Sequence, residues 1–296
     1  MRHEYKALSF RSDSLERIGV INAVIKDFMG QGFRLSVRQL YYQLVAAAII
    51  ENTERSYKRT ADLINNARIA GLMDWDAIED RGRDIELKTR WTDGNQIVQA
   101  AADSYHMDMW INQPVRVFCV VEKAALAGVL GGVCQKYDIP LLAARGYPSV
   151  SIVRDMVNDH ILPTIQAGQS AVLLHLGDHD PSGKDMTRDL EERIALFMEG
   201  EGHCEINRQA LNIDQVRRLK PPPNPAKITD SRAKAYIREF GSESWELDAL
   251  KPQYLVKLVT DEVEKLVDQN AWDEREAEVE DIRDRLQASA DSFKGE

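Results

Sequence analysis

The sequence has few cysteines and no long apolar run, and both shortages narrow the class of protein. Its three cysteines, Cys119, Cys134 and Cys204, are not spaced like the ligands of a zinc site, and two of them lie in apolar stretches. We therefore expect the cysteines to be free thiols packed in a core, as in a protein of a reducing compartment. No run of 18 apolar residues occurs, and the first residues lack the apolar segment of a signal peptide. We therefore expect a soluble, cytoplasmic protein without a membrane partner.

A nucleotide-binding loop is also missing. Five residues separate Gly177 from Gly183-Lys184, where a Walker loop has four, and Asp185 stands where a Ser or Thr must meet Mg²⁺. The sequence therefore predicts no ATPase activity of its own.

Acidic side chains outnumber basic ones, but the distribution of charge along the chain still allows a nucleic-acid partner. The formal net charge is −10, and residues 261–296 alone hold 5 basic and 13 acidic side chains. The preceding 260 residues are close to neutral, so the placement of their basic side chains decides whether a phosphate-binding face exists. With 296 residues, 44% of them hydrophobic, the chain can bury the cores of two domains.

Two apolar runs predict strands that end in carboxylates. Residues 115–121 form a β-branched and apolar run that stops at Glu122, and residues 171–176 form another that leads to Asp178 and Asp180. Each run is followed by a helical pattern, as in a parallel sheet with crossover helices. Because parallel strands place their carboxyl ends at one edge of the sheet, we expect Glu122, Asp178 and Asp180 to converge.

Three carboxylates at one edge repel each other, and a divalent cation between them removes the repulsion. Mg²⁺ is the ion that a few carboxylates and a substrate phosphate usually bind together. Glu122, Asp178 and Asp180 are therefore candidate ligands for one or two Mg²⁺ ions, for which Mn²⁺ can substitute. The alternative is structural, because an Asp before a helix caps its free N–H groups and Asp-Pro-Ser-Gly also suits a turn.

The same residues carry a resemblance to a known family. Glu at the end of one strand and Asp-x-Asp at the end of a later one resemble the signature of the Toprim domain of topoisomerases, primases and some nucleases. The longer segment Asp-His-Asp-Pro-Ser-Gly at 178–183, with Gly-Tyr-Pro at 146–148, is similar to the A subunit of topoisomerase VI and its meiotic double-strand-break relatives. The resemblance implies a Rossmann-like Toprim domain preceded by a winged helix with a catalytic tyrosine. Ser149 departs from the pattern, because an Asp commonly follows the Gly-x-Pro in that family.

The second predicted helix contains the candidate tyrosine. It begins after Ser36 with a capping-box pattern, and its apolar stripe includes Tyr41. Tyr42 lies about 100° further round, on the face of Arg38, where a guanidinium can bind phosphate oxygens and favour a phenolate. The pattern alone leaves open that Tyr42 is an aromatic packed against a neighbouring helix. The resemblance implies that Tyr42 is the nucleophile, Arg38 its phosphate-contacting neighbour and Glu122 a further catalytic residue.

A third predicted helix, from Thr53 to Ala70, carries a basic face. Two helices precede it and Arg81-Gly82-Arg83 follows it, an order that suits a helix-turn-helix with a wing. We expect this helix to approach DNA through Arg55, Lys58, Arg59 and Arg68. The alternative is an ordinary solvated face, because Glu54 and Asp62 are interspersed.

The expected fold class is therefore α/β, in two domains. Residues 1–112 form a winged-helix (helix-turn-helix) DNA-binding domain with a linker helix. Residues 113–296 form a Toprim metal-binding domain, built on a parallel sheet, with a C-terminal helical extension that frays past Ala288.

Four further charged side chains of the second domain are expected either to contact DNA or to stabilise the fold. Lys123 and Arg145 lie at predicted strand ends and are candidate contacts to DNA phosphate. Glu246 and Asp248 sit among apolar anchors and are predicted to be structural.

The leading functional hypothesis is Mg²⁺-dependent cleavage of double-stranded DNA by tyrosine transesterification, leaving a 5′-phosphotyrosyl link. The resemblance also implies a homodimer in which the tyrosine of one protomer meets the metal site of the other. Strand passage then requires an ATPase partner subunit that the sequence does not identify. One alternative is a Toprim nuclease in which the ions activate water. The other is a DNA-binding protein whose Toprim domain docks partners without catalysis.

Overall fold

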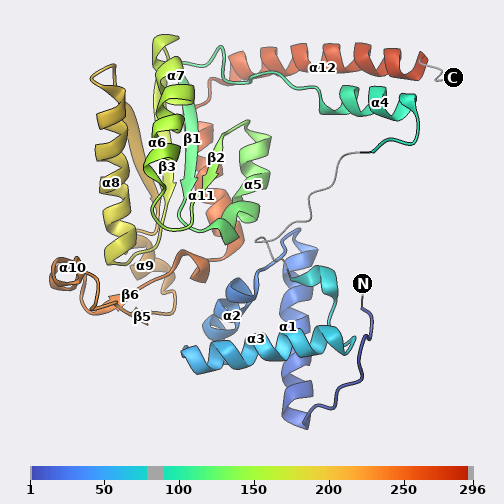
Figure 1. Ribbon diagram of the computed structural model, residues 1–296, viewed down its shortest axis with the longest axis vertical. Coiled ribbons are helices and arrows are strands. Elements are labelled where there is room, and N and C mark those ends of the chain that lie inside the picture. The colour runs from blue at the N-terminus through green and yellow to red at the C-terminus, as the bar shows by residue number, and fades with distance from the viewer. Residues whose placement is uncertain (1, 79–89, 293–296) are drawn as a thin grey trace.

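The structure is a computed structural model that describes residues 2–78 and 90–292 (Figure 1). Its N-terminal part is a group of helices around one apolar core. Within the described residues its elements are α1 (Ser12–Gly30), α2 (Val37–Ala46), α3 (Glu54–Ile69) and the 3-10 turn η1 (Trp75–Ala77).

The N-terminal helices begin where the sequence predicts. The Ser36 side chain accepts from the Gln39 backbone and the Gln39 side chain accepts from the Ser36 backbone, so the predicted capping box of α2 is confirmed. Thr53 likewise caps α3. In the wing region the structure describes a single parallel bridge between Leu35 and Ile78, and Arg81 to Arg83 lie outside the described residues.

The second part contains a four-stranded parallel sheet in the order β2-β1-β3-β4. Its strands are β1 (Val115–Val121), β2 (Leu141–Ala143), β3 (Ser170–Leu176) and β4 (Cys204–Ala210). Val121 pairs with Leu176, so β1 and β3 end at the same level and the residues that follow them are neighbours. The expected α/β class with a parallel sheet is confirmed.

Helices cover both faces of this sheet because its inner strands are apolar on both faces. One face packs against α5 (Ala127–Lys136) and α11 (Pro252–Leu266), with Val117, Cys119 and Val121 pointing toward them. The other packs against α6 (Val150–Met156), the π-helical turn η3 (Val157–Ile161), α7 (Leu162–Gln166) and α8 (Pro181–Met198).

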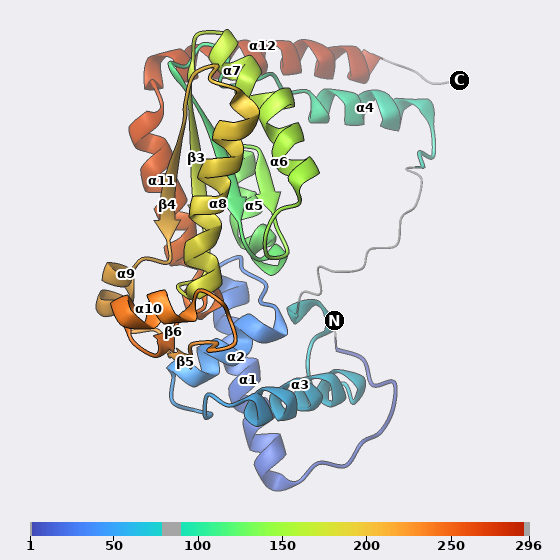
Figure 2. The same cartoon turned by 60° about the vertical axis from the view of Figure 1, so that its left-hand side comes forward.

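The remaining segments lie at the two ends of the sheet. The carboxyl ends of the strands face the N-terminal helices, with a two-stranded ribbon beside them (Figure 2). The elements at that end are η2 (Ala124–Leu126), α9 (Ile213–Leu219), β5 (Asn224–Pro225), α10 (Ala233–Phe240), β6 (Glu243–Ser244) and η4 (Leu247–Ala249). At the opposite end α4 (Gly94–Ser104) lies beside α12 (Gln269–Ser292), which runs past the predicted fraying point at Ala288 (Figure 1).

No helix within residues 2–78 and 90–292 is both long enough and apolar enough to span a membrane.

Candidate functional site

A cleft of about 1080 Å³ lies between the carboxyl ends of β1 and β3 and the helix α2. This is the edge at which open parallel sheets place their ligands. Residues from both parts of the chain line it, among them Tyr42, Glu122, Lys123, Asp178, Asp180 and Glu246. The structure therefore brings the candidate nucleophile and the three candidate metal ligands into one cavity.

Glu122 and Asp178 are held together at the ends of β1 and β3. The Asp178 backbone N–H donates to Glu122 Oε2 at 2.8 Å, and the Leu247 backbone N–H donates to Asp178 Oδ1 at 2.7 Å. Burial raises the pKa of the Glu122 carboxyl above its ordinary value. Burial also raises the pKa of Asp178 to about 7, with the neighbouring Glu122 charge adding to the effect against that of Lys123.

Asp180 has a structural role in the same loop. Its Oδ1 accepts from the Gly183 backbone N–H at 2.6 Å and caps α8, so the helix-cap interpretation is confirmed. A Cβ on Gly183 would lie 2.4 Å from the Asp178 carbonyl oxygen and 3.0 Å from Glu122 Oε2. Glycine is therefore required there for the close approach of α8 to the Asp178 backbone and the Glu122 carboxylate.

The side chain of Lys123 enters the cleft instead of pointing toward solvent. Its Nζ lies 2.8 Å from Glu246 Oε2, 3.0 Å from Asp178 Oδ2 and 3.1 Å from Asp248 Oδ2. Burial alone lowers the pKa of Lys123, but the three carboxylates outweigh burial and raise it above the ordinary value. The candidate DNA contact is thus an ammonium enclosed by carboxylates of its own chain.

Arg38 forms a bidentate ion pair that joins α2 to the second part of the chain. Its Nε donates to Glu246 Oε2 at 2.9 Å and its Nη2 to Glu246 Oε1 at 2.5 Å. Burial alone raises the pKa of Glu246, but Lys123 and Arg38 outweigh it and lower the pKa to about 2. A planar fork of this kind binds a carboxylate and a phosphate in the same way, so a phosphodiester can compete with Glu246 for Arg38.

Tyr42 combines the two interpretations that the sequence left open. The residue is 3% exposed, and its ring meets Tyr41 edge to face, with 5.3 Å between the ring centroids. Tyr42 is nevertheless among the residues that line the cleft, and its hydroxyl accepts from Asn224 Nδ2 at 2.9 Å. Burial raises the pKa of the Tyr42 phenol above its ordinary value and outweighs the lowering effects of Asn224 and Arg38. The hydroxyl is therefore protonated at neutral pH in this arrangement.

Arg208 supports the carboxylate loop and was not predicted from the sequence. It lies in β4 and its guanidinium donates to backbone oxygens of Gly183 at 2.9 Å, Gly177 at 3.1 Å and Asp178 at 2.6 Å. Burial lowers the pKa of Arg208 to about 10. Residues 204–210 are mostly polar, so no apolar pattern marks Arg208 as a buried residue.

The predicted DNA-contacting residues fall into different settings. Arg55, Lys58 and Arg59 are exposed on α3, and Lys58 pairs with Glu54 at 2.8 Å. Arg68 is half-buried. Its guanidinium lies 4.5 Å from the centre of the Trp75 ring and donates to the Trp75 carbonyl oxygen, so these contacts give Arg68 a structural role. The remaining candidate, Arg145, is exposed at the rim of the cleft.

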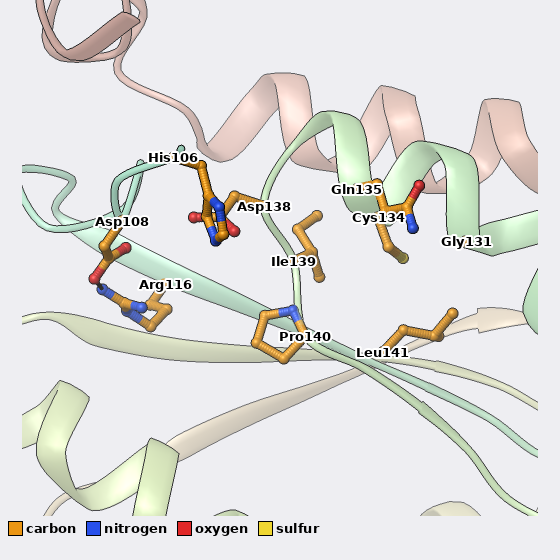
Figure 3. A pocket seen from close by; sticks show the side chains of 10 residues that line it. All are labelled: His106, Asp108, Arg116, Gly131, Cys134, Gln135, Asp138, Ile139, Pro140 and Leu141. Atoms are coloured by element: carbon orange, nitrogen blue, oxygen red, sulfur yellow. Dashed lines mark hydrogen bonds and ion pairs between the residues drawn. The ribbon is translucent and has the colours of Figure 1, made fainter. Parts of the chain in front are cut away.

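A second hollow lies at the amino ends of β1 and β2 (Figure 3). Its charged side chains Asp108 and Arg116 point toward one another, with 2.5 Å between Arg116 Nη2 and Asp108 Oδ2. Asp138 accepts from the Met109 backbone N–H at 3.1 Å. These contacts hold the segment before β1 in place, so we assign this hollow a structural role.

The carboxylate oxygens of the cleft are suitable ligands for a divalent cation, but they are not arranged around one point as metal ligands are. The acidic residues that line the cleft are Glu54, Glu122, Asp178, Asp180, Glu246 and Asp248, and the basic ones are Arg38, Lys58, Lys123, Arg145 and Lys227. Carboxylate oxygens are the ligands that a hard divalent cation prefers. Across residues 2–78 and 90–292, however, no three His, Cys, Asp or Glu side chains are grouped to hold an ion. Backbone N–H groups and Lys123 engage the carboxylate oxygens instead.

Comparisons with protein-family models, with curated proteins and with solved structures find no match. Support for a function therefore comes from the motifs of the sequence and from the geometry of the cleft.

Proposed function

We propose that this chain is a Mg²⁺-dependent enzyme that cleaves double-stranded DNA through Tyr42, in the manner of the topoisomerase VI A subunit that its motifs resemble. The observation that carries the proposal is that Tyr42 lines one cleft with Glu122, Asp178 and Asp180. In this proposal the N-terminal helices are a winged-helix domain and residues 113–296 are a Toprim domain.

The proposed metal chemistry rests on the three carboxylates at the ends of β1 and β3. Glu122, Asp178 and Asp180 would hold Mg²⁺, which would supply positive charge to the scissile phosphate. The raised pKa values of Glu122 and Asp178 support this role, because their ionised forms are destabilised until a cation joins them.

The side chains of the chain itself position and attack the phosphate. Arg38 exchanges Glu246 for a phosphodiester, since the exposed fork matches either anion. Tyr42 Oη attacks phosphorus, the phenol loses its proton, and the bond from phosphorus to the 3′-oxygen breaks. The 3′-oxygen takes up a proton and becomes a free hydroxyl, while the 5′-phosphate remains on Tyr42. Arg55, Lys58, Arg59 and Arg145 are proposed to contact the DNA backbone around the cleft.

Cutting both strands requires two clefts. We propose a homodimer, because a two-fold axis matches the symmetry of duplex DNA. The sequence resemblance implies that the tyrosine acts on the metal site of the partner, whereas Tyr42 here lies beside the carboxylates of its own chain. A single chain therefore presents both halves of the proposed site. Strand passage would require a separate ATPase subunit.

Covalent capture of DNA tests the proposal. Purified protein is incubated with labelled supercoiled DNA in Mg²⁺ or Mn²⁺, and the reaction is stopped with detergent. We expect label to stay on the wild type and on Tyr41→Phe, because the Tyr41 hydroxyl bonds to residues of the loop 51–53. Tyr42→Phe should carry none. Label on Tyr42→Phe equal to that on the wild type would overturn the tyrosine mechanism.

A metal-dependent nuclease is the second candidate, and the burial of Tyr42 favours it. A buried, protonated phenol that packs against Tyr41 can have a purely structural role. This alternative predicts that Tyr42→Phe cuts DNA undiminished, with no label on protein. If DNA is bound but neither cut nor attached, by the wild type and Glu122→Gln alike, the non-catalytic docking function remains.

A further inference from the structure

The ammonium of Lys123 lies among the carboxylates of Asp178, Glu246 and Asp248. Of these three residues, Asp178 is also a proposed ligand of the catalytic ion. Asp178, Glu246 and Asp248 each place an oxygen within 3.1 Å of Lys123 Nζ. We propose that Asp178, Glu246 and Asp248 form a cation site, that the Lys123 ammonium is its built-in occupant, and that a divalent cation of the Mg²⁺ or Mn²⁺ class takes the site when Lys123 withdraws. The inference deepens the proposed function and rests on it for the use of the ion.

The burial and the contacts of Asp248 indicate a cation site. Its side chain is 1% exposed, and within the described residues neither of its oxygens accepts a hydrogen bond. Its contacts are two cations, Lys123 Nζ at 3.1 Å and Arg38 Nε at 3.7 Å. A buried carboxylate without hydrogen-bond donors is costly unless a positive charge offsets it. Asp248 is therefore aimed at a position that a cation must fill.

The other two carboxylates complete an oxygen-rich site of the kind that hard cations prefer. Asp178 keeps its Oδ1 on the Leu247 N–H and turns Oδ2 to Lys123, so one oxygen faces the cation position. Glu246 likewise turns Oε2 to Lys123. Mg²⁺ binds oxygen at about 2.1 Å and Mn²⁺ suits the same ligands, so the carboxylates need to close in by roughly 1 Å.

Withdrawal of Lys123 has a physical cause in the same cleft. A lysine ammonium sits on a flexible four-carbon stem and binds phosphate as a point charge. Arg38, which holds the other side of Glu246, is half-exposed and can follow the same phosphate. When a phosphate attracts both cations, Asp178, Glu246 and Asp248 are left without a counter-charge, and a divalent cation restores it. The site therefore gains an ion as the substrate arrives.

Counting bound Mn²⁺ tests the site without DNA. Free Mn²⁺ is followed by electron paramagnetic resonance as the full chain is titrated, and Lys123→Met removes the ammonium at nearly constant volume. We expect Lys123→Met to bind one more Mn²⁺ per chain than the wild type. Lys227→Met, a matched change at an exposed lysine of the same cleft, should bind as the wild type does. The double variant Lys123→Met with Asp248→Asn should lose the additional ion.

The result that overturns the proposal is equal Mn²⁺ binding by Lys123→Met and the wild type, or an additional ion that persists in the double variant. If Lys123→Met unfolds without metal, circular dichroism during the titration gives the answer. Refolding with Mn²⁺ supports the site, and a chain that stays unfolded at saturating Mn²⁺ contradicts it.

The proposed cation site and the proposed DNA cleavage can be tested separately. Glu122→Gln removes a ligand of the proposed catalytic ion and none of this site, so the additional ion should persist when it is combined with Lys123→Met. Covalent capture of DNA is measured separately, on the wild type. Each of the two results can therefore be negative while the other is positive.

Discussion

Replacing Arg208 with Met should loosen the loop that carries Asp178 and Asp180. The guanidinium donates to the carbonyl oxygens of Asp178 and Gly183 at 2.6 and 2.9 Å, and Met leaves these oxygens without that partner. A hydrogen bond to a charged group contributes about 1.5–3 kcal/mol to stability. Met also removes the cost of burying the charged guanidinium, which offsets part of the stability lost with the two hydrogen bonds. We therefore expect the free energy of unfolding to fall by about 3 kcal/mol, or the Tm by roughly 6–12 °C.

Urea unfolding followed by circular dichroism measures this change, and a matched arginine provides the control. Arg217 on α9 is 74% exposed and its nearest carboxylate oxygen, on Asp214, is 3.7 Å away. Arg217→Met should therefore change stability by no more than about 0.5 kcal/mol. A loss below about 1 kcal/mol for Arg208→Met, or equal losses for the two variants, would refute the role assigned to Arg208.

Three further predictions follow from the cleft. Gly183→Ala should cost about 1–3 kcal/mol and weaken Mn²⁺ binding, because its Cβ would meet a backbone oxygen at 2.4 Å. Gly131→Ala, whose Cβ meets nothing within 4 Å, should be neutral or stabilising in thermal unfolding. Because the pKa of Asp178 is raised from 3.8 to about 7, the folded state binds more protons than the unfolded state in this range. Metal-free stability should therefore fall as pH rises between these values, by up to about 1.4 kcal/mol per pH unit, and Asp178→Asn should flatten the profile. Finally, Glu246→Gln should break the bidentate pair with Arg38 and speed amide hydrogen exchange in α2; unchanged exchange would contradict that role.

The sequence is sufficient to predict the elements whose signals are local. The apolar runs before Glu122 and Asp178 predict β1 and β3, and their pairing places both carboxylates at one edge. Asp180 before Pro181 predicts the cap of α8, which the hydrogen bond to Gly183 confirms. Each of these follows from side-chain periodicity or from the needs of a helix end.

The contacts that the sequence does not predict are those between distant segments. The sequence predicts a structural role for Glu246 and Asp248, but it does not predict their ion pairs with Lys123, more than a hundred residues earlier. Tyr42 leaves the apolar stripe of its helix, yet it is buried, and Asn224, 182 residues away, bonds to its hydroxyl. Tertiary packing decides such burial, and helical periodicity carries no information about the segment that comes to lie on the outer face.

In the proposed reaction the hydroxyl of Tyr42 becomes joined to DNA. Mass spectrometry of peptides from the detergent-stopped, nuclease-digested reaction measures this directly. We predict a nucleotide phosphate on the peptide that contains Tyr42, formed only with Mg²⁺ or Mn²⁺. DNA cut in the presence of metal while every tyrosine-containing peptide remains unmodified would contradict it.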